Sequence, residues 1–544
     1  MTSRGDLTGQ PDLTHAHPMR PLHARRPEYV DLLPPCNEAC PAGEDIQGWL
    51  ALAQAGRYEE AFQHLVRDNP LPAIHGRVCY HPCESRCNRA ELDTSVSIHA
   101  VERFLGDRAL AEGWRLSPGA ATGKRVLIVG AGPSGLSAAH QLRRLGHDVE
   151  VRDAGPVAGG MMCFGIPAYR LPRAVIRGEV ARIEAMGARV VLNHKVEDVL
   201  RAKDEGSFDA VFLAIGAHIG KKTDIPARDA GKVLDALSLL ASVARGDAPK
   251  LGRRVAIYGG GNTAMDAARV VKRLGYEPLI IYRRDREHMP AHPFEADEAI
   301  EEGVMVHWLR TIKAIEGSAF TVEEMELDAQ GRACPTGRTE TLEADALVLA
   351  LGQDVDTELL RRVPGVELQK DGVVKVGPDL MTGHPGIFAG GDMVPSERTV
   401  TIAVGHGKKA ARAIDAFLRG EQHRPREKAR VVGFRDLHVW YSTEADRTVQ
   451  PHLEGPRRIE SFDEIVGGLS EPAATFEAKR CLSCGNCYEC DGCLGACPSG
   501  AVIKLGRGSR YRFDYDRCTG CAVCAEQCPV DAIRMSPAPT TEGR

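Results

Sequence analysis

Cysteine placement constrains this chain more than any other feature of its sequence. Of the 17 cysteines in 544 residues, five lie between residues 36 and 87 and ten between residues 481 and 528, so only Cys163 and Cys334 occupy the long middle. The first 29 residues contain basic side chains but no apolar core, so we expect neither an export signal nor a disulfide framework. At ~150 residues per domain, three or four units are expected. The cysteine distribution predicts a metal-binding unit at each end of an α/β body.

The C-terminal cysteines form two copies of one motif, C-x2-C-x2-C-x3-C-P. In this motif three thiolates bind one [4Fe–4S] cube while the fourth cysteine turns to the other cube. Zinc is the alternative, but two complete runs that each end in proline do not resemble a zinc ribbon. We predict one cluster on Cys487, Cys490, Cys493 and Cys528, and a second on Cys518, Cys521, Cys524 and Cys497.

Cys481 and Cys484 precede the first copy at the same spacing. They could be ligands of a further centre, alternative ligands of the first cluster, or bystanders. We interpret them as bystanders.

Residues 124–153 contain a dinucleotide-binding fingerprint. A β-branched strand runs into the sequence GAGPSG, an amphipathic helix follows, and a second strand ends at an acidic residue. The glycines permit a tight turn, the approach of a pyrophosphate and close packing of helix on strand, and the acid accepts the ribose hydroxyls. We predict cofactor contacts at Gly130, Gly132, Pro133, Ser134, Gly135, Asp153 and Gly160.

A second fingerprint begins at residue 253 with RRVAIYGGGNTAMDAAR. We predict nucleotide contacts at Gly259, Gly261, Asn262, Thr263 and Ala264. Its second strand ends in Arg283 and Arg284 instead of an acid, which favours the 2′-phosphate of NADP(H) over NAD(H). The alternative is that the two arginines form a solvated turn, which would leave NAD(H) as the nucleotide.

The segment GIFAGGDMV, residues 386–394, separates a flavoprotein from a plain dehydrogenase. It reads as a buried strand that ends at Gly391 and Asp392, followed by a helix near Thr401. An aspartate at that position can bind the ribityl and pyrophosphate region of FAD, and the helix N-terminus would face the flavin.

The N-terminal cysteines, Cys36, Cys40, Cys79, Cys83 and Cys87, flank a segment with helical periodicity. By spacing alone they indicate either one iron–sulfur cluster with a remote fourth ligand or a zinc site.

The motifs GAGPSG, GGMMCFGIPAYRLP, GGGNTAMDAAR with YRR and MPA, and GIFAGGD follow one another in this order. Over most of residues 31–420 the chain resembles the small-subunit family of NADPH-dependent glutamate synthase and the flavin half of dihydropyrimidine dehydrogenase. The resemblance implies FAD on the first Rossmann domain, NADPH on a second domain inserted into it, and an N-terminal helical unit with iron–sulfur clusters.

The resemblance also implies one N-terminal [4Fe–4S] cluster on Cys40, Cys79, Cys83 and Cys87. The family's second N-terminal cluster needs a C-x2-C pair upstream of Cys36 and a side-chain ligand near Glu102. That upstream pair is absent. We therefore predict a single N-terminal cluster and interpret Cys36 as a supporting residue or a remnant.

The predicted fold is multidomain. It comprises an α-helical iron–sulfur domain, two α/β Rossmann-like domains with the second inserted in the first, and a small α+β ferredoxin-like domain. The boundaries are a disordered lead-in at 1–30, the helical domain at 31–120, the FAD domain at 121–225 and 346–420, the NAD(P)H domain at 226–345, a connector at 421–477 and the ferredoxin domain at 478–544.

These features predict a cytoplasmic oxidoreductase or electron-transfer subunit that moves electrons between NADPH and a protein partner through FAD and [4Fe–4S] clusters, in either direction. Ferredoxin or a partner subunit, for example a 2-oxoacid:ferredoxin oxidoreductase, is the expected partner. The alternatives are the glutamate synthase small subunit itself, flavin-based electron bifurcation with a further flavin subunit, and a non-catalytic relay or assembly scaffold.

Several other functions are not expected. The cofactors perform hydride transfer, so no catalytic acid or base is predicted. Disulfide reduction is not expected because Cys163 has no nearby mate. A net charge of -5 gives no reason to expect nucleic acid, and no apolar run is long enough for a membrane span.

Overall fold

The computed structural model describes residues 25–221, 223, 225–228, 232–422, 427–440, 442–506 and 508–538. Residues 1–24 of the predicted lead-in therefore lie outside the described residues. Within the described ranges, no helix is both long enough and apolar enough to cross a bilayer.

The first sheet is parallel and has five strands: β2 (Arg125–Val129), β3 (Asp148–Arg152), β4 (Arg189–Val191), β5 (Ala210–Leu213) and β17 (Ile387–Ala389), in the order β17-β5-β2-β3-β4. Val126 and Ile128 pack on one face against α7 (Pro133–Arg144), α9 (Arg173–Ala185) and α14 (Val400–Leu418). Leu127 and Val129 pack on the other face, which α10 (Val199–Glu205) covers in part. The sheet is buried on both faces, which explains its nearly continuous apolar strands.

The second sheet is also parallel and has five strands: β8 (Lys232–Asp235), β9 (Arg254–Tyr258), β10 (Glu277–Tyr282), β11 (Met305–Trp308) and β15 (Ala346–Leu349), in the order β11-β10-β9-β15-β8. One face packs against α11 (Ala236–Ala244), α12 (Asn262–Arg273) and α13 (Pro293–Glu301). The other face packs against a four-stranded sheet of β7 (Ala227–Arg228), β12 (Arg310–Glu316), β13 (Ala319–Leu327) and β14 (Ala333–Glu343). The predicted pair of Rossmann-like sheets is confirmed.

All strands of the second sheet lie between β5 and β17 in the sequence. The chain leaves the first sheet through β6 (Ile219–Gly220) and returns through β16 (Gln353–Asp354), and these two short strands pair antiparallel. The two chain segments that connect the sheets therefore lie side by side.

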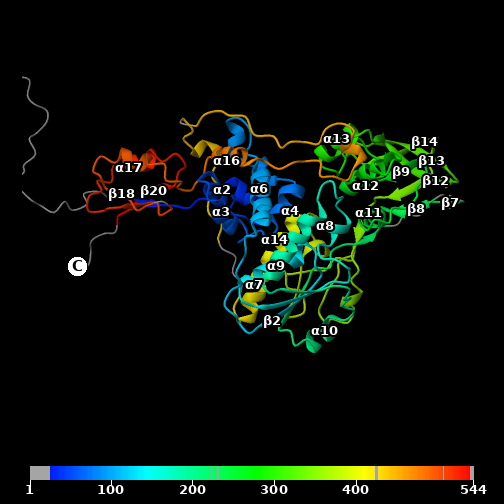
Figure 1. The fold of residues 1–544 in the computed structure, drawn as a ribbon, viewed down its shortest axis with the longest axis horizontal. Helices are drawn as coiled ribbons and strands as arrows, with labels where there is room; N and C mark the ends of the chain where they lie inside the picture. The colour runs from blue at the N-terminus through cyan, green and yellow to red at the C-terminus, as the bar shows by residue number, and fades with distance from the viewer. Residues whose placement is uncertain are drawn as a thin grey trace, which may run out of the picture.

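The N-terminal unit is helical, with α1 (Pro35–Ala39), α2 (Ile46–Gln54), α3 (Tyr58–Leu65), α4 (Pro72–Val78), α5 (Pro82–Ser85) and α6 (Ile98–Glu112). Trp49, Phe62 and Leu105 are fully buried in its core. In Figure 1 this unit lies between the C-terminal unit on one side and the second sheet on the other.

A helix from far along the chain completes this helical core. Helix α16 (Glu471–Lys479) packs on α2 and α6, and its Ala474 and Ala478 are buried there. The sequence predicts a domain boundary between residues 477 and 478, but Ala474 and Ala478, on either side of it, are both buried in the core of the helical unit. The apolar face of α16 finds its partner only in the folded N-terminal helices, so local sequence could not reveal the contact.

Buried Arg480 holds the end of α16 in place. Its guanidinium donates to the backbone oxygens of Thr94, Ser95 and Ala445 and to the carboxylates of Asp93 and Glu477. Because each N–H is satisfied in a buried position, the chain segment after α16 has a fixed path.

The C-terminal unit contains α17 (Gly492–Ala496), β18 (Val502–Lys504), β19 (Tyr511–Phe513), α18 (Val523–Glu526) and β20 (Ile533–Pro537). Strand β1 (Arg25–Tyr29) pairs antiparallel with β20, and the ring of Tyr29 lies 5.1 Å from that of Phe513. Our lead-in prediction is therefore wrong for Arg25–Tyr29, which form a strand. Their polar sequence gives no strand signal. The strand forms because the edge of β20, far along the chain, supplies its hydrogen-bond partners.

The predicted connector contacts three units. Ile465 donates its backbone N–H to the Tyr169 oxygen at 3.0 Å, and Glu464 pairs with Arg77 of the helical unit at 2.7 Å. Arg458 pairs with Glu302, the residue after α13, at 3.1 Å. Glu302 also binds Arg269 and Arg273. Burial opposes ionisation of Glu302, but the hydrogen bonds from Arg273 and Arg269 outweigh it and lower its pKa to about 2.

We expect Glu302→Ala to destabilise the protein by about 3–5 kcal/mol, because it leaves the buried Arg273 guanidinium without a carboxylate and removes one of the two carboxylate partners of buried Arg269. Thermal unfolding followed by circular dichroism measures the effect. Glu301→Ala is the matched control, since the Glu301 side chain is 66% exposed and pairs with Arg458 at 3.6 Å. Its cost should stay below about 1 kcal/mol. Equal shifts for the two variants would contradict this account.

Candidate functional site

A cavity of about 1250 Å³ lies between the two Rossmann sheets. Both fingerprints contribute to its wall, so a cofactor on one sheet and a nucleotide on the other would share one space. The predicted contact residues that line it are Gly130, Gly132, Pro133, Ser134, Asp153, Gly160, Asn262, Thr263, Gly391 and Asp392.

The three glycines of the first fingerprint have different roles. A Cβ on Gly130 would lie 2.3 Å from the Ala214 oxygen, and one on Gly135 would lie 1.9 Å from the Gly130 oxygen. A Cβ on Gly132 would have no protein atom within 4 Å. The first and third glycines are therefore required by the fold, while the middle one leaves space on the cavity side for a pyrophosphate.

The second fingerprint repeats this division. A Cβ on Gly259 would lie 2.3 Å from the Ala350 oxygen, whereas one on Gly261 would meet nothing within 4 Å. Ala264 is fully buried at the third position. The free space at the second glycine again fits a bound diphosphate.

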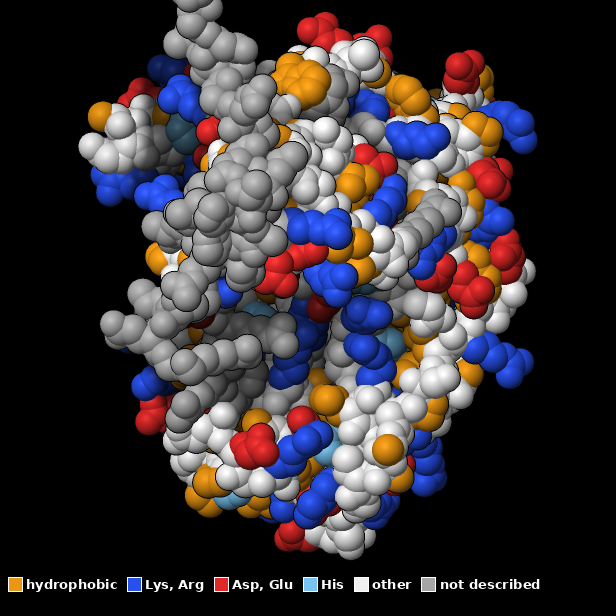
Figure 2. All heavy atoms as spheres, turned by 90° about the vertical axis from the view of Figure 1, so that its left-hand side faces the viewer, with side chains coloured by type: hydrophobic (Ala, Val, Ile, Leu, Met, Phe, Trp, Pro, Cys, Tyr) orange, Lys and Arg blue, Asp and Glu red, His pale blue; other side chains and the backbone are white. Residues whose placement is uncertain are grey.

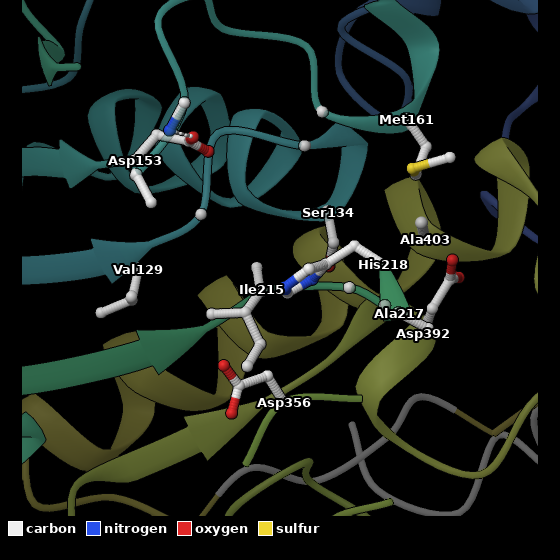
Figure 3. A pocket seen from close by; sticks show the side chains of 18 of the residues that line it. Val129, Ser134, Asp153, Met161, Ile215, Ala217, His218, Asp356, Asp392 and Ala403 are labelled. Carbon is white, nitrogen blue, oxygen red and sulfur yellow. Dashed lines mark hydrogen bonds between the residues drawn. The ribbon is translucent and has the colours of Figure 1, made fainter. Parts of the chain in front are cut away.

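Polar groups at both ends of the cavity suit a dinucleotide. Asp153 accepts hydrogen bonds from the backbone N–H groups of Ala131 at 2.6 Å and Gly155 at 2.7 Å, which fix its carboxylate at the cavity wall. The hydroxyl of Ser134 is buried without a hydrogen-bond partner among the described residues. Figure 3 shows Asp153 and Asp392 on opposite sides, with Ser134 between them. Burial raises the pKa of Asp392 to about 6, and Arg398 partly opposes the shift. These donors and acceptors fit the ribose, pyrophosphate and ribityl groups of FAD.

The N-terminal end of α14 faces the same cavity through Thr399, Val400 and Ala403. Thr401 is turned away from it and hydrogen-bonds the thiol of Cys79. Because Val78 and Tyr80 also line the cavity, Cys79 lies directly behind the cavity wall.

Arg283 and Arg284 follow β10 and do not line the cavity in the described part of the chain. Arg283 is exposed, and Arg284 donates to the Tyr282 hydroxyl at 2.9 Å. They lie beyond the same strand end as the second fingerprint, where the 2′-position of a bound nucleotide is expected.

Two cavity residues were missed by the sequence analysis. Tyr80 accepts a hydrogen bond from Asn262 at 2.7 Å and stacks on His292, with 3.5 Å between ring centroids. Arg170 binds Asp266 at 2.8 Å and also pairs with Glu295. Both residues lie in the motifs GRVCYHPC and GIPAYRLP. No role was assigned to them from the sequence, because their partners lie on α12 and at α13, beside the second sheet. Together they fix the position of the second sheet against the rest of the protein.

The N-terminal cysteines fall into two groups. Cys40, Cys79 and Cys83 lie near one another, and the buried carboxylates of Glu44 and Glu102 lie beside them. The remaining cysteines, Cys36 and Cys87, line a separate small cavity together with Cys481 and Cys484.

The C-terminal cysteines also form two groups. Cys487, Cys490, Cys493 and Cys528 line one cavity of about 20 Å³. Cys518, Cys521 and Cys497 are the cysteine neighbours of Cys524. The structure thus brings together the same sets that the alternating ligand rule of two-cluster ferredoxins requires.

Sulfur spacing distinguishes a cluster from a single zinc ion. Zinc–sulfur bonds of about 2.3 Å place the four sulfurs of a tetrahedral site about 3.8 Å apart. Within the described ranges, the only trios of ligand atoms that all lie within 4.8 Å of one another contain histidine and glutamate without cysteine. Among the described residues, no three cysteine sulfurs are therefore close enough together for one zinc ion.

The fold and the shared cavity define a nucleotide-dependent oxidoreductase. A family model described as pyridine nucleotide-disulphide oxidoreductase matches residues 124–407. Models described as dihydropyrimidine dehydrogenase domain II with a 4Fe–4S cluster and as a 4Fe–4S binding domain match residues 30–114 and 511–534. The chain belongs to the pyridine nucleotide-disulphide oxidoreductase family.

Three relatives indicate which kind of oxidoreductase this chain resembles. The beta subunit of NADP(+)-dependent formate dehydrogenase from Moorella thermoacetica is 36% identical, over 83% of this chain and 70% of that protein. The beta subunit of NADPH-Fe(3+) oxidoreductase from Geobacter sulfurreducens is 32% identical, over 83% of this chain and 75% of that protein. The small chain of NADPH glutamate synthase from Escherichia coli is 34% identical, over 74% of this chain and 96% of that protein.

The resemblance to the glutamate synthase small-subunit family is therefore confirmed, as is the prediction of an electron-transferring oxidoreductase. The predicted kinds of cofactor, FAD, NADP(H) and [4Fe–4S] clusters, are confirmed at the level of the family. The family name includes disulfide reduction, but no cysteine lines the large cavity among the described residues. Cys163 is buried, and its thiol donates to the Ala158 oxygen.

The unequal roles of the fingerprint glycines can be tested by substitution. We expect Gly132→Val to fold normally but to be purified with little or no bound flavin, because its side chain enters the space kept for the pyrophosphate. Gly135→Val should lower the yield of folded protein, because its Cβ meets the Gly130 oxygen. Flavin absorbance per chain and thermal unfolding of the flavin-free protein separate the two effects. A flavin-replete Gly132→Val variant would show that the ligand is bound elsewhere.

Proposed function

We propose that this chain is the nucleotide-oxidising, electron-delivering subunit of a larger oxidoreductase. NADPH would bind the second Rossmann sheet as an inserted domain, and FAD would bind the first. The observation that carries the proposal is the single cavity lined by both fingerprints, with Cys79 directly behind its wall. In this arrangement a nicotinamide and a flavin can meet without solvent between them, and a cluster ligand is close by.

The protein groups of the first sheet would hold and orient the flavin cofactor. Gly132 and the start of α7 would contact the pyrophosphate, Asp153 would accept the ribose hydroxyls, and Asp392 would contact the ribityl chain. When bound, FAD supplies the conversion between two-electron hydride chemistry and single-electron transfer. The buried N-terminal end of α14 would place its positive dipole beside the flavin ring, where it favours negative charge.

Electrons would leave the cavity through the helical unit. Cys79 is flanked by the cavity residues Val78 and Tyr80, and the Thr401 hydroxyl bonds its thiol. A cluster on this group would therefore be the first acceptor. The C-terminal cysteine groups, in a small ferredoxin-like domain, would be the last.

The C-terminal end of the molecule is the proposed docking face for the partner. Figure 2 looks onto this end and shows Lys and Arg side chains near the middle of the face together with Asp and Glu side chains, and hydrophobic side chains scattered among polar ones. A partner oxidoreductase subunit fits best, because the relatives in formate dehydrogenase and Fe(3+) oxidoreductase are named as beta subunits. Ferredoxin and a 2-oxoacid:ferredoxin oxidoreductase are the other candidates.

The remaining alternatives fit less well. The C-terminal cysteine groups lie outside residues 31–420, the part of the chain that resembles a glutamate synthase small subunit. A non-catalytic scaffold would not need two intact fingerprints that share one cavity. We place the protein in the cytoplasm, because the proposed cluster ligands must stay reduced and an oxidising compartment would favour disulfides between them.

Anaerobic titration with NADPH, followed by visible absorbance, tests the proposed function. We expect stoichiometric bleaching of the flavin. If a flavin-replete sample is reduced by neither NADPH nor NADH, the oxidoreductase role is excluded and the scaffold alternative takes its place.

Nucleotide preference is tested by Arg283→Ala. Loss of a charge-assisted contact with the 2′-phosphate should raise the KM for NADPH by about tenfold or more and leave the KM for NADH unchanged. Arg286→Ala is the control, because Arg286 is an exposed arginine on the same loop that pairs with Asp297. If Arg283→Ala changes the KM for NADPH and the KM for NADH equally, this arginine does not contact the 2′-phosphate.

A further inference from the structure

A small cavity of about 20 Å³ lies where the helical unit meets the C-terminal unit, and cysteines from both ends of the chain surround it. Cys36 and Cys87 come from the N-terminal unit, and Cys481 and Cys484 follow α16. Most of the other lining is apolar, including Pro34, Leu50, Val96, Ile98 and Leu482. We propose that these four cysteines bind a further [4Fe–4S] cluster, assembled from the two ends of the chain.

The local backbone at Cys481 and Cys484 matches that of the predicted ferredoxin ligands. In three C-x2-C turns the residue before the second cysteine has a positive φ: 53° at Ser483, 62° at Glu489 and 66° at Gly520. Positive φ at a residue other than glycine costs about 1–3 kcal/mol and persists only where the surroundings impose it. Two bystander cysteines would not require a strained turn of the ferredoxin kind.

The hydrogen bonds to the Cys481 sulfur also resemble those to the predicted ferredoxin ligand Cys518. The Ser483 N–H points to the Cys481 sulfur at 3.4 Å, just as the Gly520 N–H points to the Cys518 sulfur at 3.4 Å. The amide of Asn88 also donates to the Cys484 sulfur at 3.5 Å. Such donors stabilise cluster-bound thiolates and tune their potential.

The site also resembles that of the first predicted ferredoxin cluster in the volume of its cavity. The cavity has the same volume, about 20 Å³, as the one lined by the predicted ligands of the first ferredoxin cluster. Buried Arg89 lines it as well, and its guanidinium pairs with Asp93. Among the described residues no three cysteine sulfurs are close enough together for one zinc ion.

The proposed site explains why the family pattern seemed incomplete. The C-x2-C pair that the resemblance places upstream of Cys36 is supplied instead by Cys481 and Cys484, after α16 has packed into the helical unit. Cys36 is then a ligand, in place of the remnant or supporting residue that we inferred from the sequence. Cys87 moves from the predicted N-terminal cluster to the new site. Glu102, beside Cys40 and Cys79, is left as the candidate fourth ligand for the first group.

The location of the site gives it a role. Cys36 lies near Cys83 of the first group, and Cys484 belongs to the same apolar core as Cys493 and Cys528. A cluster here would connect the centre behind the flavin cavity with those of the C-terminal unit. The ligand assignment stands on its own, whereas the relay role rests on the proposed function.

Iron content tests the assignment on the full chain purified without oxygen. Four clusters correspond to about 16 iron and 16 sulfide per chain, and three to about 12. We expect about 16 in the wild type and about 12 in the double variant Cys481→Ser with Cys484→Ser, at unchanged flavin content. The control is Cys334→Ser, which changes a thiol on β14 and should keep about 16. A wild type with about 12 iron, or a double variant with wild-type iron, would overturn the proposal.

If the double variant does not fold, a variant that keeps all the cysteines tests whether Cys484 is a cluster ligand. Asn88→Ala removes one hydrogen bond to the Cys484 sulfur and should keep all the iron while one cluster shifts to a lower midpoint potential in a redox titration monitored by EPR. If no potential shifts, Cys484 is not a ligand. Flavin bleaching by NADPH should survive in both variants, so failure of the proposed function would be seen separately.

Discussion

The packing of α14 between α7 of its own domain and the helical unit is the constraint on which the rest of the structure depends. A Cβ on Gly405 would lie 2.1 Å from the Pro41 oxygen of the helical unit, and one on Gly407 would lie 2.3 Å from the Ser134 oxygen of the flavin-side helix α7. Only residues without a side chain allow this approach. Because α14 is held on both sides, its first turn faces the cavity while Thr401 reaches Cys79. Flavin chemistry and iron–sulfur chemistry are thereby joined across a single helix.

The two ends of the chain are combined in space, although they are far apart in the sequence. Strand β1 joins β20 in the C-terminal unit, and α16 joins the N-terminal helices. Buried Arg480 fixes the second of these crossings. The result is a sequence of cysteine groups that runs from the nucleotide cavity, through the helical unit, to the C-terminal unit. Such an arrangement suits electron transfer between a buried flavin and a partner at the far end.

Local patterns allowed much of this molecule to be predicted. The two fingerprints and the duplicated cysteine motif determine short-range geometry, so both Rossmann-like sheets and the general cofactor class followed from the sequence. Features that depend on distant partners did not. The strand character of Arg25–Tyr29, the return of α16 and the contact of Tyr80 with Asn262 each require a surface that exists only after folding. For the same reason the pair Cys481 and Cys484 was interpreted as incidental.

The central claim is that electrons pass from the nucleotide cavity into the cysteine groups of the same chain. The most direct measurement is EPR on the oxygen-free protein, frozen at successive times after mixing with NADPH. The account predicts that reduced [4Fe–4S] signals grow as the flavin is reduced and finally involve more than one cluster. Reduction of the flavin with every cluster left oxidised, in a sample whose clusters dithionite can reduce, would contradict it.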